Sequence, residues 1–449
     1  MAPMIRRRML STVHHAELAM FQSALHQAAS RLVGACSMVE HPAMRTVVDV
    51  AQRVIGEHEG RGEVLPKGGL VHRCAELCVR YALALAHGQH ERAAIFRSYL
   101  QYLPCDPLWL ESVFTYEQFR QRRLPLPYIR HAHLDDFVLA PLPDSVRVAL
   151  VSDWGTGTPA AQALLEHVAC LKPHVLVHLG DIYYSGTPHE VRTHFLDVLD
   201  RVFTSGRPRV YALSGNHDRY SGGEGYMMLL EELGQPASYF CLRTAHWQLL
   251  ALDTGLHDQD PAMPRQRVTY LEAGEVEWLR HHLTDRRGSI ILSHHPYFSW
   301  EGTGVDAQGR RPAVNPNLML AVDPLLRSIH WWFWGHEHNL LIYEPWANLV
   351  RGRCIGAGAI PRLVGEQRNA PTADLVLPRG ESAPPRVLAG TGLENDGVVD
   401  NHAFAVLDLD GDKAVARYYQ IPARDLVPGR LRTGLRPCFE ETARPRPKR

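Results

Sequence analysis

The feature that most constrains the fold is a short apolar run that ends directly in a polar residue. Residues 175–179 form an apolar run interrupted only by His178, and Gly180 and Asp181 follow it. A short apolar run bounded by glycine predicts a buried strand. Since ligands of open α/β sheets bind at the edge where the strands end, we expect the Asp181 side chain at such an edge.

The same pattern occurs four more times along the chain. The other strand segments and the residues that follow them are 146–152 before Asp153, 209–214 before Asn216, 289–293 before His294, and 329–334 before His336 and His338. A single Asp after a strand is more often a turn residue, so the prediction depends on the recurrence. If the five strands share one parallel sheet, their terminal side chains meet at one edge.

Segments with helical character alternate with these strands. They cover residues 159–171, 188–203, 222–234 and 272–284. This alternation predicts a layered α/β domain. Two more strands are expected within 240–254, and others at 340–343, 352–356, 404–407 and 414–419, the last two joined by a hairpin turn at Asp410 and Gly411.

Four parts are predicted along the chain. Apolar residues at helical spacing, such as Leu18, Phe21 and Leu25, predict a helical domain over residues 1–125, for which we prefer a structural or dimer-forming role. A proline-containing linker (126–145), the α/β domain (146–430) and a basic, flexible tail (431–449) follow. The Pro- and Gly-rich segment 361–401 is expected to be either a lid over a site or disordered.

Composition disfavours several classes of protein. The chain has 48 Lys and Arg residues and 48 Asp and Glu residues, so no overall field attracts nucleic acid or anionic lipid. The eight cysteines contain no C-x-x-C pair, which favours a reducing compartment. Arg6 and Arg7 resemble part of a twin-arginine signal, but polar residues follow where an apolar core is required. We therefore expect a cytoplasmic protein without a membrane-spanning helix.

Seven side chains that follow the strands are candidate metal ligands. They are Asp153, Asp181, Tyr184, Asn216, His294, His336 and His338. Oxygen and imidazole donors without thiolate suit iron, manganese or zinc. Seven donors are too many for one ion and suit two ions that share a carboxylate. Two cations about 3.5–4 Å apart can hydrolyse phosphate esters, because they hold the attacking and leaving oxygens.

These residues form motifs that resemble the calcineurin-like metallophosphoesterase superfamily, most closely its purple acid phosphatase branch. In chain order the motifs are Asp153-Trp154-Gly155, Gly180-Asp181-Ile182-Tyr183-Tyr184, Gly215-Asn216-His217-Asp218, Ile291-Leu292-Ser293-His294 and Gly335-His336-Glu337-His338. Outside the purple branch a histidine ligand occupies the position of Gly155. The purple branch uses a tyrosine instead, which the resemblance places at Tyr184.

The resemblance covers residues 146–360 and implies a four-layer α/β/β/α sandwich with two divalent or trivalent metal ions. Iron paired with iron, manganese or zinc is the implied composition. One ion would bind Asp153, Asp181, Tyr184 and His338. The other would bind Asp181, Asn216, His294 and His336, with Asp181 as the bridge.

Three further residues are candidate catalytic groups. The resemblance implies that His217 contacts the phosphate and protonates the leaving group, and the neighbouring carboxylate of Asp218 could orient its ring. His295 could contact the phosphate or could equally be a structural residue before Pro296.

The implied activity is hydrolysis of a small phosphomonoester by in-line attack of a metal-held hydroxide, without a covalent intermediate. One alternative is a phosphodiesterase of the same fold, acting on cyclic nucleotides or nucleic acid. Another is a non-catalytic protein that binds a phospholigand at the same site.

Overall fold

The structure is a computed structural model that describes residues 101–102, 106, 109–261, 268–362, 372, 374–395, 399–431 and 434–445. The chain divides into two compact units, one of residues 1–114 with 361–367 and one of residues 115–360 with 368–449. The predicted N-terminal helices lie almost entirely outside the described residues. Helix α6 (Trp109–Arg122) is the exception.

Two six-stranded sheets form the centre of the second unit. In spatial order the first sheet consists of β14 (Phe439–Ala443), β13 (Lys413–Ile421), β12 (His402–Asp410), β1 (Ser145–Val151), β2 (Val175–His178) and β3 (Arg209–Ala212). The second consists of β4 (Phe240–Arg243), β5 (Trp247–Ala251), β6 (Gly288–Leu292), β8 (Ile329–Trp334), β10 (Gly352–Ile355) and β9 (Leu340–Ile342). Strands β1, β2 and β3 are parallel, and so are β5, β6, β8 and β10. Strands β7 (Arg311–Pro312) and β11 (Leu375–Val376) form a separate pair.

The sheets stack face to face because their strands are apolar on both sides. In β1, Val148 and Leu150 belong to the core between the two sheets. Ala149 and Val151 belong to the core between the first sheet and its helices. Successive residues of a strand face opposite sides, so one apolar run contributes to two cores.

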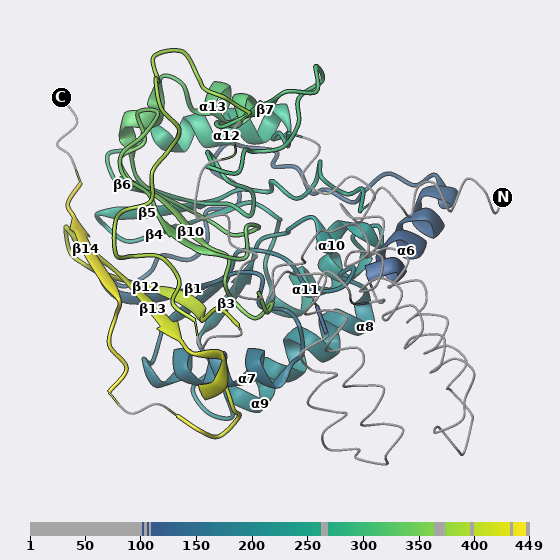
Figure 1. Cartoon of the computed structure of the whole chain (residues 1–449). Coiled ribbons are helices and arrows are strands. Elements are labelled where there is room, and N and C mark those ends of the chain that lie inside the picture. The colour runs from purple at the N-terminus through teal and green to yellow at the C-terminus, as the bar shows by residue number, and fades with distance from the viewer. Residues whose placement is uncertain are drawn as a thin grey trace, which may run out of the picture. The chain divides into compact units, whose positions relative to one another are not determined.

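Helices cover the outer faces of both sheets (Figure 1). The first sheet packs against α7 (Pro159–Cys170), the π-helical turn η1 (Val191–Leu196), α9 (Asp197–Val202) and α11 (Glu224–Leu233). The second sheet packs against α12 (Ala273–Leu283) and α13 (Pro316–Val322). Short helical segments complete the unit: α8 (Pro188–Glu190), α10 (His217–Tyr220), η2 (Leu325–Ser328) and η3 (Ala423–Asp425). The predicted α/β/β/α sandwich is confirmed.

One expectation about the strands is wrong. The five strands that end in polar residues do not share a sheet, because β1, β2 and β3 belong to the first sheet and β6 and β8 to the second. Their ends nevertheless meet, since the parallel strands of both sheets open toward the same site. The backbone N–H of His336, after β8, donates to Asp153 Oδ2, after β1, over 3.0 Å.

The predicted linker and tail are both partly built into this unit. Residues 137–139 run beside β4, where the Leu139 N–H donates to the Cys241 carbonyl and the Cys241 N–H donates to the Phe137 carbonyl, each over 2.9 Å. Residues 439–443, predicted as part of a flexible tail, form strand β14 and pair with β13. The second compact unit begins at residue 115, within the segment predicted as the helical domain.

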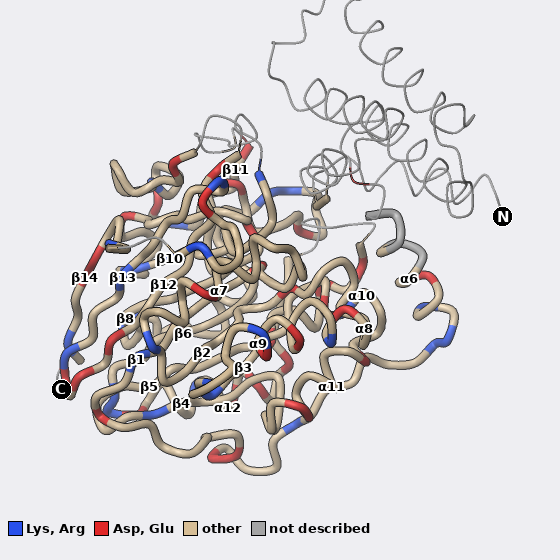
Figure 2. Tube along the Cα trace, turned by 90° about the horizontal axis from the view of Figure 1, so that it is seen from below, with Lys and Arg blue, Asp and Glu red and all other residues tan. Residues whose placement is uncertain are grey.

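Charge is distributed without a dominant sign over the described residues. Figure 2 shows Lys and Arg interspersed with Asp and Glu along the trace. None of the described helices has the length and apolar composition that a bilayer span requires.

Candidate metal centre

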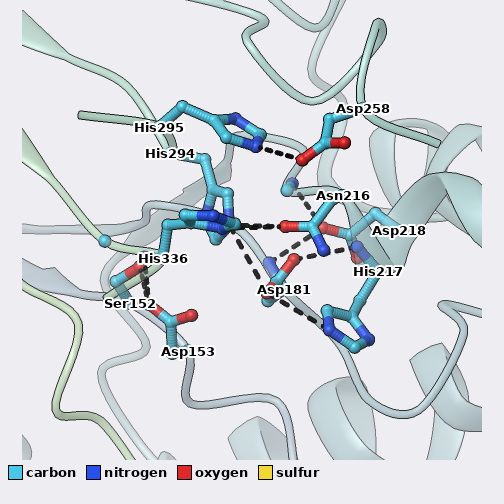
Figure 3. A network of polar contacts seen from close by, with 12 residues as sticks. Ser152, Asp153, Asp181, Asn216, His217, Asp218, Asp258, His294, His295 and His336 are labelled. Atoms are coloured by element: carbon cyan, nitrogen blue, oxygen red, sulfur yellow. Dashed lines mark hydrogen bonds and ion pairs between the residues drawn. The ribbon is translucent and has the colours of Figure 1, made fainter. Parts of the chain in front are cut away.

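The polar residues that follow five strands come together at one place (Figure 3). Asp181 follows β2, and its Oδ2 lies 3.4 Å from Nε2 of His294, which follows β6. Asn216 follows β3, and its Oδ1 lies 3.0 Å from Nδ1 of His336, which follows β8. The sequence pattern therefore identified residues that the fold brings together.

Glycines allow the strand ends to approach this closely. A Cβ atom on Gly215 would lie 2.0 Å from Oδ1 of Asp181, and one on Gly180 would lie 2.7 Å from Nδ1 of His294. A Cβ atom on Gly155 would lie 2.8–2.9 Å from Ile182. This contact explains why the first motif ends in glycine, since no side chain fits at position 155 without displacing the second motif.

Four of the candidate ligands have a backbone conformation that side chains rarely adopt. Asp153, Asp181, His336 and His338 have φ angles of 54°, 76°, 67° and 47°. They make up four of the ten non-glycine residues with positive φ in the described part of the chain. Such strain clusters at functional sites, where the surrounding structure holds it in place.

The first group of donors contains two carboxylates, an imidazole and a phenol. Ligand atoms of Asp153, Asp181 and His338 lie within 4.8 Å of one another. The hydroxyl of Tyr183 lies among them, 2.9 Å from Asp153 Oδ1, 3.0 Å from Asp181 Oδ2 and 2.9 Å from His338 Nε2. These four side chains could hold one cation.

The second group is built from an amide and imidazoles. His294 Nε2 lies 3.2 Å from Asn216 Oδ1 and 3.3 Å from His336 Nδ1. Ligand atoms of His294, His295 and His336 also lie within 4.8 Å of one another. The Asp181 carboxylate contacts both groups, through Tyr183 and through His294. The Asp181 carboxylate thus lies between the two groups.

The phenol in this cluster comes from Tyr183 rather than from the predicted Tyr184. Tyr184 borders the site through its main chain, because its carbonyl oxygen lies 2.6 Å from His217 Nδ1. Its N–H donates to Glu190 Oε1. The two tyrosines are adjacent, and the spacing of the motif favoured the second. Tyr184 stays the ligand that the motif predicts, and Tyr183 is the alternative that these contacts support.

Buried charges in the cluster compensate one another. Burial alone would raise the pKa of Asp181, but the charges of His294 and His217 outweigh it and hold that pKa well below its ordinary value. Burial would likewise lower the pKa of His294, but the Asp181 carboxylate raises it to about 9. Burial also raises the pKa of Tyr183 well above its ordinary value. Cations that bound here would take the place of these protons.

Asp218 does not have the expected role of orienting His217. Its carboxylate accepts hydrogen bonds from the N–H groups of Gly215, Asp181 and Ile182 at 2.7, 2.9 and 3.1 Å. Burial, with the charge of Asp181, raises the pKa of Asp218 to about 7. The carboxylate thus ties together the turns after β2 and β3, while the Tyr184 carbonyl orients the His217 ring.

His295 borders the cluster and pairs with a residue that the motifs did not indicate. Its Nε2 lies 3.0 Å from Oδ2 of Asp258, and both side chains are buried. The two rings of His295 and His336 lie 4.5 Å apart between centroids. The Oγ1 of Thr254 accepts hydrogen bonds from the N–H groups of His294 and His295 over 3.2 and 3.0 Å.

Sequence reasoning missed Tyr183, Thr254 and Asp258. Thr254 follows β5 in the same way that Asp153 follows β1, so the pattern of a strand followed by a polar residue could have found it. Asp258 lies in an irregular loop, where no periodic signal indicates which side chain faces the site.

Stacked sheets between helices, with carboxylate, amide and imidazole groups gathered at the strand ends, are the features that the resemblance to metallophosphoesterases implies. Residues 146–340 match the family model described as calcineurin-like phosphoesterase. This part of the chain, somewhat less than half of its length, is therefore similar to that family. No curated protein matches the chain.

Several solved structures are similar to this chain at low identity. A purple acid phosphatase from yellow lupin (Lupinus luteus) seeds is 14% identical, with a TM-score of 0.39, over 68% of this chain and 55% of the lupin chain. GAP50, the anchor in the inner membrane complex of Plasmodium, is 12% identical, with a TM-score of 0.43, over 67% of this chain and 89% of its own. The chain thus spans little more than half of the lupin protein.

Proposed function

We propose that this protein is a metal-dependent phosphomonoesterase with a dinuclear centre. The observation that carries the proposal is the convergence of side chains from both sheets. Each of Asp181, Asn216, His294 and His336 has a carboxylate, amide or imidazole atom 3.0–3.4 Å from such an atom of at least one of the others. Buried charges at such distances are expected where cations bind.

Each proposed ion would have four protein ligands. Asp153, Asp181, Tyr183 and His338 would hold one, and Asp181, Asn216, His294 and His336 the other. The donor set fits iron in the first position, because a phenol is available, and iron, manganese or zinc in the second. When bound, such ions lower the pKa of a coordinated water and offset the charge that develops on the phosphoryl oxygens.

His217 is the residue best placed to act on the ester oxygen. Its Nδ1 lies against the Tyr184 carbonyl, so Nε2 faces the cluster, 3.9 Å from Asp181 Oδ2. The ring packs between those of Tyr183 and Tyr220, each with its centroid 4.5 Å from that of His217. This packing fixes the imidazole so that Nε2 can contact the phosphate and transfer a proton to the leaving oxygen.

A small monoester is the proposed substrate because nothing in the charge distribution favours a polymer. Basic and acidic residues are equal in number over the whole chain and interspersed over the described residues (Figure 2). A nucleic acid substrate requires a continuous basic surface.

We also propose that the protein is cytoplasmic. The four described free thiols, Cys170, Cys241, Cys354 and Cys438, support this location.

The decisive assay compares p-nitrophenyl phosphate with bis(p-nitrophenyl) phosphate, using protein reconstituted with iron, manganese or zinc. We expect faster hydrolysis of the monoester and loss of activity in Asp181→Asn. Faster hydrolysis of the diester would support the alternative that the protein is a phosphodiesterase. Metal-loaded protein that binds phosphate but hydrolyses neither ester would contradict the enzymatic proposal.

A further inference from the structure

A cavity of about 340 Å³ lies beside the candidate metal centre and has no role in the proposal so far. Its size is in the range of small-molecule sites, about 300–1,000 Å³. One wall is largely apolar and comes from α6 and the segment after it, with Phe119, Leu126 and Tyr128. The other wall comes from the loop after β5, with Leu256, His257 and Gln259. We call this cavity the rim pocket.

The rim pocket and the metal centre share the loop after β5. Asp258 lies between two residues that line the pocket, and its carboxylate pairs with His295 in the metal centre (Figure 3). The wall of the rim pocket that α6 contributes also contacts a segment near the metal centre. Phe119 packs against Gly222, where a Cβ atom would lie 2.3 Å from the Phe119 ring. Gly222 follows α10, the short helix that begins with His217.

The charged groups of the rim pocket pair with one another, whereas one buried acceptor has no partner within the described part of the chain. Glu272 accepts hydrogen bonds from Arg130 NH2 over 2.8 Å and contacts His257 Nε2 at 3.0 Å. The Oε1 atom of Gln259 is buried and has no hydrogen-bond partner among the described residues. A buried acceptor without a partner is costly, so this oxygen is suited to a donor on a ligand.

We propose that the rim pocket binds the organic group of the phosphoester substrate, and that this group is a ring-bearing alcohol with one hydrogen-bond donor. The apolar wall contacts the ring, and Gln259 Oε1 accepts the hydrogen bond. The inference rests on the proposed function, because the phosphate of the same molecule must lie at the metal centre. Substrate specificity would therefore reside in the loop after β5 and in the segment after α6.

Phosphonates test the inference without catalysis, since their carbon–phosphorus bond is not hydrolysed. Isothermal titration calorimetry on the metal-loaded full chain measures the affinity for inorganic phosphate, methylphosphonate, benzylphosphonate and ring-hydroxylated benzylphosphonates. We expect benzylphosphonate to bind at least about tenfold more tightly than methylphosphonate. At least one hydroxylated analogue is expected to bind more tightly still.

Two variants test whether the tighter binding of the ring and of its hydroxyl group takes place in the rim pocket. Leu126→Trp fills the pocket and removes the preference for the ring, while the affinity for phosphate is unchanged. Gln259→Leu keeps the preference for the ring and loses the gain from the ring hydroxyl. Leu320→Trp is the control, because Leu320 is 70% exposed on α13 and lies outside the pocket.

The outcomes separate this inference from the proposed function. If phosphate binds but methylphosphonate and benzylphosphonate bind with equal affinity, the rim pocket does not bind the organic group of the substrate. The same conclusion follows if Leu126→Trp still binds benzylphosphonate more tightly than methylphosphonate. If phosphate does not bind to the metal-loaded protein, the proposed function fails and the inference fails with it.

Discussion

Tyr183 and Tyr184 are adjacent, yet only the hydroxyl of Tyr183 is placed among Asp153, Asp181 and His338 by the observed contacts. A phenolate bound to ferric iron absorbs visible light. We therefore predict that iron-loaded wild type is coloured, that Tyr183→Phe loses the colour, and that Tyr184→Phe retains it. Visible absorbance spectra measure this directly. Loss of colour in Tyr184→Phe alone would restore the ligand that the motif spacing favours.

His217 and Asp218 are neighbours in sequence with different roles in the structure. His217→Asn removes the imidazole at the ester oxygen and should lower kcat about 100-fold or more, with metal content unchanged. Steady-state kinetics combined with elemental analysis separates the two effects. A His217→Asn variant with wild-type kcat would show that another group protonates the leaving oxygen.

Asp218→Asn should act on stability instead. Its carboxylate accepts three backbone hydrogen bonds, and an amide has only one oxygen to accept them. We expect the free energy of unfolding to fall by about 1–3 kcal/mol, measured by urea denaturation. Unchanged stability with a loss of activity would return Asp218 to the catalytic role expected from the sequence.

At the scale of the element, α12 carries a buried carboxylate at its first turn. Glu275 Oε1 accepts from the Asp253 N–H over 2.8 Å, and Oε2 accepts from the Tyr128 hydroxyl over 2.9 Å. Asp253 also pairs with the fully buried Arg219 over 2.6 Å. Burial, with the charge of Asp253, raises the pKa of Glu275 to about 8. The helix is therefore held by a carboxyl group that is protonated at neutral pH.

This raised pKa makes stability depend on pH in a defined direction. The unfolded chain releases the Glu275 proton above its ordinary pKa, whereas the folded chain retains it up to about pH 8. The contribution of Glu275 to stability is thus complete in acid and is lost as the pH rises toward 8. Glu275→Gln should abolish this decline, as measured by urea denaturation across pH.

The exposed residue Glu277 on the same helix provides the control, because Glu277→Gln should leave the pH dependence unchanged. An equal decline in wild type and Glu275→Gln would show that other groups are responsible.

Strand β14 connects the two sheets through Glu441. This carboxylate accepts hydrogen bonds from Arg353 Nε and Trp331 Nε1 over 2.8 and 2.9 Å, and from Arg351 Nε over 3.0 Å. Arg353 lies on β10 and Trp331 on β8, both in the second sheet. The network therefore fastens an edge strand of the first sheet to the second.

Breaking this network should be costly because the arginine that loses its partner is buried. We predict that Glu441→Gln lowers the free energy of unfolding by about 3 kcal/mol, measured by urea denaturation. Glu440→Gln on the same strand is the control, since Glu440 pairs with Arg417 with half of its side chain exposed, and should cost less than about 1 kcal/mol. Equal effects of the two variants would contradict the connecting role.

At the scale of the whole molecule, local patterns predicted a layered α/β domain and the strand ends that carry the candidate site, while the four layers were implied by the family resemblance. Apolar runs with polar residues after them identified the ends of β1, β2, β3, β6 and β8. The division of these strands between two sheets was missed, since an apolar strand does not indicate its neighbour. Strand β14 was missed because Glu440 and Glu441 give it a polar sequence, although Arg351 and Arg353 neutralise Glu441 in the fold.

The choice between Tyr183 and Tyr184 could not be made from spacing either. Two adjacent tyrosines satisfy nearly the same motif, and the path of the backbone after Asp181 decides which ring enters the cluster. The position of the Asp258 side chain likewise depends on the path of an irregular loop, which the sequence pattern does not indicate. Local patterns thus located the metal centre, while the selection of individual side chains depended on tertiary structure.

The central claim is that strand ends from two sheets hold two cations with Asp181 between them. Metal content per chain after reconstitution, measured by plasma mass spectrometry, tests it most directly. The account predicts about two ions in wild type. It also predicts loss of both ions in Asp181→Asn and loss of only one in Asn216→Ala or His338→Ala. Full metal content in Asp181→Asn, or a single ion in wild type, would contradict it.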